Sequence, residues 1–459
     1  MATTSHLNYP RLRTRLLDEF VDVGTSQGQS QPATSRDPAT GMIRWADSTI
    51  QLGFYIGMLA TEYAILDNPD THPDMNRGGG TIRDTREELH HALAALERLD
   101  AVADLSFDSP CTQTEQINGF FIRDDIPEEA WNHFPGTTTV RSDYVDPIPT
   151  QKEMSQDQVY HLLSGLALVR RFVPTDVTVE SRGLADWATD LALGIIDHTY
   201  GDGSWQISNP ACDDREVDRG SNASGYALAT SAVGTWFSDG AVVLDYPAHA
   251  ETLAELGRDP GAVFYLEEDN LHMAMTVFAA GNAWEDTTTD DLMGLAESHG
   301  WVIYPLLHQA LHGPTQAWCD GGHATIAAAD AMLEELSEFQ EPASPWPDTT
   351  SHGFTSWNRF IRGAEQTYGG IESTAGLRFA GVDYLLLHNL LVLTTPGAWT
   401  DALDPECPPD GTDSSDGDTA AGTPKTGCGC AATSVADGPS GFAALLLALI
   451  GVRRRDRTS

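Results

Sequence analysis

The sequence predicts an all-α domain, on two observations and one absence. Apolar residues recur at helical spacing along most of the chain, as Leu89, Leu93 and Leu96 do. Ser155 and Gln158 have the spacing of a capping box, which marks the start of a helix. The apolar-polar alternation of half-buried strands is scarce. Together these features favour helices packed on helices.

Six helices are expected in order, over residues 45–66, 85–99, 155–173, 184–195, 326–339 and 382–393. In the first, Ile50, Phe54 and Met58 share one face, as helical spacing requires. Thr85 with Glu88 is predicted to cap the second helix, before its leucine stripe.

The later helices follow the same pattern. The third starts at the Ser155 box. The fourth repeats apolar residues at Leu184, Trp187 and Leu191, and the fifth follows His323. The sixth is apolar nearly all round, which is typical of a fully buried helix.

Long segments rich in aromatic and acidic residues connect these helices, at residues 118–127, 201–220, 265–270 and 346–358. Helix pairs joined by such loops look like an (α/α) toroid-like barrel, the architecture of many glycoside hydrolases and polysaccharide lyases. This resemblance is one of architecture only. A helical-repeat solenoid is the alternative, but the chain has no fixed period.

The chain carries 67 acidic and 26 basic residues, a formal net charge of -41. Such a field repels nucleic acid and anionic lipid, so we expect neither as a bulk partner. Only Lys152 and Lys425 are lysines. An acidic surface almost free of lysine suits a chain that works in salt, because salt screens its self-repulsion.

The C-terminal residues have three parts: Cys428 and Cys430, an apolar run over residues 441–452, and an arginine cluster at 453–457. At ~1.5 Å per residue the run spans roughly 18 Å, whereas a bilayer core needs about 30 Å. By length alone it could be a buried helix. The preceding residues 404–426, however, are dense in Asp, Gly, Pro, Ser and Thr and predict a disordered acidic linker.

This order of features resembles the MYXO-CTERM sorting tail. The resemblance implies export, recognition by a membrane sorting protease near Cys428 and Cys430, and anchoring or processing at the cell surface. Residues 1–20 contain no apolar run of a signal peptide. We therefore expect the true start of the chain upstream of Met1.

The sequence thus predicts four regions: a flexible arm (1–40), an all-α domain (41–403), the linker (404–426) and the sorting tail with its hydrophobic helix (427–459). Four cysteines precede the tail, at positions 111, 212, 319 and 407. In an exported chain they predict one or two disulfides, with the partners left open.

Arg123, Asp124 and Asp125 directly follow an aromatic pair. Aromatic rings stack on sugar faces and carboxylates transfer protons, so the segment is a candidate subsite with Asp124 and Asp125 catalytic and Arg123 binding substrate. An ordinary ion-paired turn is the alternative.

Asp157 and His161 lie four residues apart at a predicted helix start, so they share a face and could act as an acid–base pair. The alternative is structural, because an acidic residue in a first helical turn also complements the helix dipole.

Further substrate-binding candidates are Trp205, Arg219 and Asn222, in a polar loop around Cys212, and Glu268, in an acidic cluster before a helix. A disulfide-pinned surface loop and a solvated helix start are the alternatives. His308 with His312 and Asp383 with His388 are interpreted as structural. No metal or cofactor is expected.

Two functions stay open. The first is an exported all-α domain that binds a carbohydrate, with hydrolysis or lysis by paired carboxylates in a central cleft as its catalytic form. The second is a non-catalytic surface protein for adhesion or envelope organisation. The substrate and the oligomeric state are beyond the sequence.

Overall fold

The computed structural model describes residues 4–45, 48–68, 81–106, 117–145, 153–200, 207–208, 216–218, 223–241, 296, 302–313, 316–335 and 378–395. The chain divides into two units, Met1–Cys407 and Pro408–Ser459. The described residues all belong to the first unit, and the predicted sorting tail lies outside them. Helices account for 64% of the described residues, which confirms the prediction of a mainly helical body.

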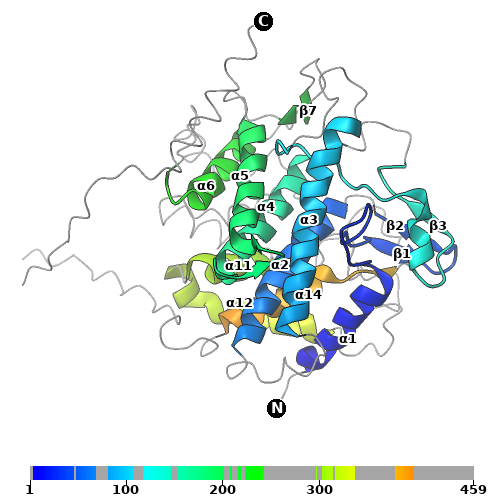
Figure 1. Ribbon diagram of the computed structural model, residues 1–459. Helices are drawn as coiled ribbons and strands as arrows, with labels where there is room; N and C mark the ends of the chain where they lie inside the picture. Colours follow the sequence, from blue (N-terminus) through cyan, green and yellow to red (C-terminus); the bar gives the residue numbers. More distant parts are fainter. Residues whose placement is uncertain are drawn as a thin grey trace, which may run out of the picture. The chain divides into compact units, whose positions relative to one another are not determined.

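Helix α2 (Ser48–Asp67) is buried along nearly its whole length. It packs against α3 (Ile82–Ser106), α4 (Gln156–Phe172) and α14 (Val382–Thr394), as Figure 1 shows. All residues of α14 are buried too. Helices that are apolar all round can be stable only inside a core, and this is where both lie.

Helices α14, α2 and α4 run in the same direction. Gly53 of α2 lies against His161 of α4, and Gly57 lies one turn further on against Gly165. On the other side of α2, Asn389 of α14 donates to the Met58 carbonyl at 3.2 Å. Since Leu386 contacts Gly57, positions increase together along these helices too. Their amino ends therefore lie at one end of the body.

Helix α3 runs antiparallel to α2. Tyr55, early in α2, donates its hydroxyl to Glu88, whereas Glu62, late in α2, accepts from Thr85 at 2.7 Å. The amino end of α3 thus lies at the carboxyl end of α2.

The remaining helices are α5 (Leu184–Tyr200), α6 (Ala223–Phe237), α11 (Ile303–His312) and α12 (Gln316–Glu335). The carboxyl ends of α4, α6 and α11 meet. Arg170 of α4 donates to the carbonyl of Phe237, the last residue of α6. The ring of Trp236 packs on His312, the last residue of α11, with centroids 5.7 Å apart.

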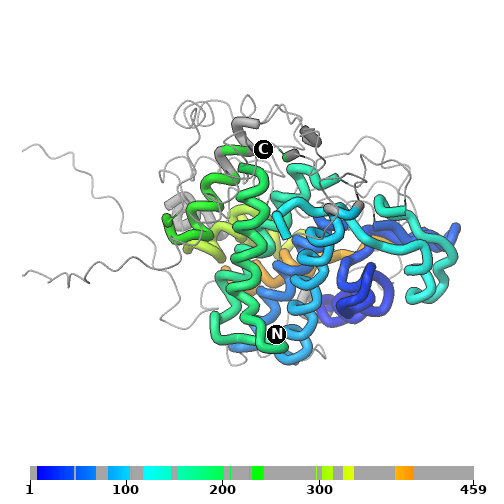
Figure 2. Tube along the Cα trace, turned by 45° about the horizontal axis from the view of Figure 1, so that its top comes forward, coloured from blue at the N-terminus to red at the C-terminus, as the bar shows by residue number. Residues whose placement is uncertain are grey.

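Helix α1 (Thr4–Glu19) belongs to the core. It contacts α14 and α12, and Figures 1 and 2 show it, in blue, beside α14, in orange. Leu12, Leu16 and Phe20 are buried. A flexible arm over residues 1–40 is therefore not what the structure has at residues 4–40, because the apolar face of α1 finds a partner far along the chain.

A buried polar cluster joins α1, α2, α3 and α14. Arg13 of α1 contacts Glu62 at 3.0 Å and Glu88 at 2.5 Å. Tyr9 donates to Glu62 at 2.6 Å and accepts from Asn389 of α14 at 3.0 Å. Buried charges need such partners, and this arrangement explains how an N-terminal helix is held so firmly.

Short strands were not predicted. A four-stranded sheet has the order β3-β2-β1-β8, from Thr139–Arg141, Met42–Arg44, Ser35–Asp37 and Arg378–Phe379. β1 is antiparallel to β2 and to β8, and β2 is parallel to β3. Two small hairpins pair β4 (Thr178–Val179) with β5 (Arg182–Gly183) and β6 (Ile207–Ser208) with β7 (Glu216–Asp218). Strands of two or three residues are too short to show alternation.

One predicted cap is confirmed and the other is wrong. Ser155 caps α4, and its amide donates to Gln158 at 3.2 Å. Helix α3, however, begins a turn before Thr85, where Thr81 and Asp84 exchange hydrogen bonds. Thr85 lies inside the helix, and its hydroxyl donates to Glu62 instead of capping the helix.

Candidate functional site

Asp124 is buried and organises a turn. Its carboxylate accepts the amide hydrogens of Asp143 at 2.8 Å, Ile126 at 3.1 Å and Tyr144 at 3.4 Å. Burial, together with the neighbouring carboxylate of Asp143, raises the pKa of Asp124 to about 8. The side chain therefore joins two stretches of loop, and in this position it is held away from solvent.

Asp125 is also buried and holds the segment near residue 28 to α3. Arg98 of α3 donates to it through Nε at 2.6 Å and Nη2 at 3.3 Å. The amide of Gly28 donates at 3.0 Å, and Gln31 donates through Nε2. These donors occupy both carboxylate oxygens, so the observed contacts of Asp125 are structural.

The Arg123 segment lies beside the start of α4. Ile122 forms an isolated antiparallel bridge with Glu153. Arg123 donates from Nε to the carbonyl of Glu153 at 2.8 Å. The structure therefore brings two of the predicted candidate segments together, the one at Arg123 and the one at the start of α4. The contacts between them are structural and show no catalytic arrangement.

The predicted pair Asp157 and His161 lies in the first turns of α4, but it is not joined through the carboxylate. The hydroxyl of Ser155 donates to the Asp157 carboxylate. His161 contacts the backbone oxygen of Asp157 through Nδ1 at 2.6 Å. Since a carbonyl oxygen only accepts, Nδ1 carries the proton and Nε2 presents a lone pair.

His161 is only 1% exposed, and burial lowers its pKa. The edge of the Phe54 ring restrains it, with centroids 4.8 Å apart. Within the described residues, its Nε2 is buried and has no hydrogen-bond partner. A neutral imidazole with a free acceptor is able to take a proton from a hydroxyl group.

Further polar side chains lie at the same end of the body. Ser48 and Thr49 open α2, are buried, and have hydroxyl groups without partners in the part of the chain that the structure describes. Asp383, in the first turn of α14, is buried as well. Because α14, α2 and α4 are parallel, these residues and His161 collect at one end. Sequence reasoning missed Ser48 and Thr49, whose signal is two hydroxyl residues opening an otherwise apolar helix.

The other predicted site residues lie outside the described residues. These are Trp205, Arg219, Asn222, Glu268, Cys428 and Cys430. Arg219 and Asn222 precede α6 directly in the sequence.

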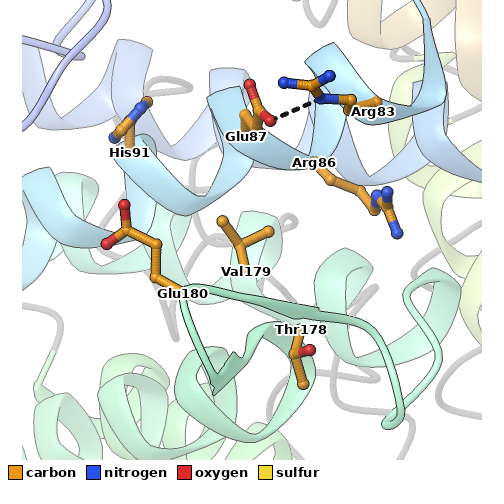
Figure 3. A pocket seen from close by; sticks show the side chains of 7 residues that line it. All are labelled: Arg83, Arg86, Glu87, His91, Thr178, Val179 and Glu180. Carbon is orange, nitrogen blue, oxygen red and sulfur yellow. Dashed lines mark hydrogen bonds and ion pairs between the residues drawn. The ribbon is translucent and has the colours of Figure 1, made fainter.

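A pocket of about 500 Å³ lies at the opposite end, between the amino end of α3 and the β4–β5 hairpin (Figure 3). Helix α3 lines it with Arg83, Arg86, Glu87 and His91. The hairpin lines it with Thr178, Val179 and Glu180. This volume lies in the range of small-molecule sites.

The hairpin wall of this pocket is fixed in place. Its two-residue turn, Glu180–Ser181, has φ of 50° and 69°, values that side chains other than Gly or Asn rarely adopt. Arg182 forms an ion pair with Glu97 of α3 and lies 3.5 Å from the centroid of the Trp187 ring. Glu180 lies 3.7 Å from Nε2 of His90. The pocket is therefore built by tertiary contacts and not by one helix alone.

The predicted structural pair His308 and His312 is close, with ring centroids 5.0 Å apart. Burial and the neighbouring His312 lower the pKa of His308 to about 3. Among the described residues, no group of three or more His, Cys, Asp or Glu residues could hold a metal ion. None of the helices in that part of the chain is long and apolar enough to cross a membrane.

Comparisons with protein-family models, with curated proteins and with solved structures gave no match for this chain.

Proposed function

We propose that this chain is an exported, surface-displayed protein whose helical body binds a carbohydrate at the amino ends of α14, α2 and α4. One observation carries the proposal: the acceptor Nε2 of His161 is buried and has no partner in the described residues, at the end of the body where the hydroxyl and carboxylate residues of the first turns lie. A sugar hydroxyl donates to such an acceptor and accepts from such hydroxyl groups. Buried polar atoms normally have partners, and the hydroxyl groups of a carbohydrate would supply them.

The proposal includes the (α/α) toroid. Its support is the order of helix directions. Helices α14, α2 and α4 are parallel to one another, and α3 is antiparallel to α2. Continuation of this order of directions through α6 and α11, determined by crystallography, would support a ring. Helices in an open layer would contradict it.

Glycan binding is tested with the full chain, because removal of residues 1–40 would delete the buried face of α1. Wild type is screened on a glycan panel beside Asp157→Asn and His161→Gln, with the exposed Asp18→Asn as control. We expect the first two variants to lose binding at unchanged secondary structure, while Asp18→Asn retains it. A wild type that binds no glycan, or variants that bind as well as wild type, would exclude the proposal.

A non-catalytic surface protein is the second candidate, and one observation favours it. The carboxylates of Asp124 and Asp125, two of the four predicted catalytic residues, are committed to buried hydrogen bonds. Incubation with any glycan bound on the panel separates the alternatives. Cleavage that Asp157→Asn abolishes supports hydrolysis or lysis, and stable binding without cleavage supports adhesion.

Surface display follows from the resemblance of the tail to MYXO-CTERM signals. A membrane sorting protease is the proposed partner, with Cys428 and Cys430 at the processing site. Cys428→Ser with Cys430→Ser should leave the protein unprocessed in cell fractions, whereas Cys319→Ser should be processed normally. Normal processing of the tail variant would refute this part.

A further inference from the structure

The pocket between α3 and the β4–β5 hairpin carries an inference that is independent of the site at the amino ends of α2 and α4. Its charged groups are not all paired. Arg83 donates to Glu87 at 2.9 Å, and Glu180 lies near His90. Arg86 has no ion-pair partner among the described residues, and its Nε is buried without a hydrogen bond. The formal charges of the lining balance, with two Arg and two Glu residues, but Arg86 is a cation without an ion pair in the part of the chain that the structure describes.

A second residue that lines the pocket from α3 is His91. Nδ1 of His91 is buried and has no hydrogen-bond partner within the described part of the chain. Figure 3 shows α3 with Arg86 and His91 on one side of the pocket and the hairpin on the other. A guanidinium group with its fork of donors matches a carboxylate in geometry and charge.

The rest of the lining limits the kind of anion. Two carboxylates, Glu87 and Glu180, border the pocket and repel each negative charge of a ligand, so a singly charged carboxylate that pairs with Arg86 fits this lining. The same carboxylates and the Thr178 hydroxyl can bind ligand hydroxyl groups. We propose that this pocket is a binding site for a carboxylate-bearing sugar, with Arg86 as its anchor.

The proposal has a test in which charge is controlled. Glucuronate is titrated calorimetrically into the full chain at constant ionic strength, beside Arg86→Gln and Arg83→Gln. Both variants remove one positive charge from α3, but Arg83 is already paired and is 74% exposed. A lost hydrogen bond to a charged group predicts about tenfold or greater weakening for Arg86→Gln, and little change for Arg83→Gln. Equal losses in the two variants would overturn the assignment.

The opposite wall gives a second pair of variants that leaves Arg86 intact. Thr178→Asp places a third carboxylate at the pocket and should abolish glucuronate binding through repulsion. Thr178→Asn should retain most of it. Circular dichroism checks that each variant is folded.

The probes decide the ligand class. Glucuronate should bind more tightly than glucose, which lacks the charge, and than acetate, which lacks the hydroxyl groups. The proposal fails if glucuronate does not bind to wild type, or if either comparison compound binds as tightly. No variant is shared with the glycan screen above, so failure at one site is distinguishable from failure at the other.

Discussion

Gly53 of α2 and Gly165 of α4 meet backbone to backbone: a Cβ atom built on Gly165 would lie 2.2 Å from the carbonyl oxygen of Gly53. A Cβ on Gly53 would in turn lie 2.4 Å from the carbonyl of His161. No side chain fits at either position. This close crossing sets the distance between the two parallel helices and presses His161 against α2, where Phe54 restrains its ring.

Gly165→Ala should therefore destabilise the protein. Overpacking of a close-packed core costs about 1–3 kcal/mol, and here the clash is with backbone that cannot rotate away. Urea unfolding measures the loss. Gly194→Ala is the matched control, since it is also helical but its Cβ would lie 3.9 Å from the nearest atoms. The control should be neutral or stabilising, and equal behaviour of both variants would contradict the crossing.

Arg13→Met should be strongly destabilising. It leaves the buried carboxylates of Glu62 and Glu88 without their common cation, and loss of one partner of a buried ion pair costs about 3–5 kcal/mol. Unfolding in denaturant gives the number. Arg83→Met, in an exposed pair, should change stability little. A small effect of Arg13→Met would mean that α1 is not anchored through this cluster.

Asp124 should make stability fall as pH rises. Its pKa in the folded protein, about 8, lies above the ordinary value of 3.8. A raised pKa means that the folded state holds the proton more tightly, so this contribution is complete below 3.8 and is lost as pH rises through 8. Asp124→Asn should flatten that decline between about pH 4 and pH 8, the window between the two pKa values. If the urea midpoints of wild type and variant stay parallel with pH, Asp124 does not titrate in this way.

His308 should act in the opposite direction. Its pKa, lowered from 6.5 to about 3, means that the unfolded state takes up the proton first. The stability contribution is therefore complete above 6.5 and is lost as pH falls toward 3. His308→Leu should reduce this acid sensitivity in thermal unfolding, whereas the half-exposed His133→Gln should not. Unchanged acid sensitivity of His308→Leu would be evidence against the assignment.

Local sequence patterns predicted the helices because their signals lie within one helix. The apolar stripes of α4 and α5, the all-apolar face of α14 and the Ser155 cap each depend on residues a few positions apart. The same locality explains the wrong cap at Thr85. Its spacing to Glu88 is that of a capping box, but its partner is Glu62, which local spacing cannot reveal.

The candidate site could be predicted only in part for a similar reason. The pattern indicated Asp157 and His161 as a pair on one helix face, and they do lie together at the start of α4. The contact of Nδ1 with the Asp157 backbone oxygen is local, whereas the packing of His161 against Gly53 and Phe54 involves a distant segment. The contacts of Asp125 with Gln31 and Arg98 likewise come from distant segments, so a carboxylate beside aromatic residues looked catalytic in the sequence.

The sequence by itself determined the mainly helical body, the position of its clearest helices and the excess of negative charge, because composition and short-range periodicity carry that information. Tertiary structure alone decided that α1 belongs to the core, that α14, α2 and α4 are parallel, and that Arg86 faces the β4–β5 hairpin across a pocket. Each of these depends on contacts between residues far apart in the chain. Such contacts form only where complementary shape and charge meet in the folded protein.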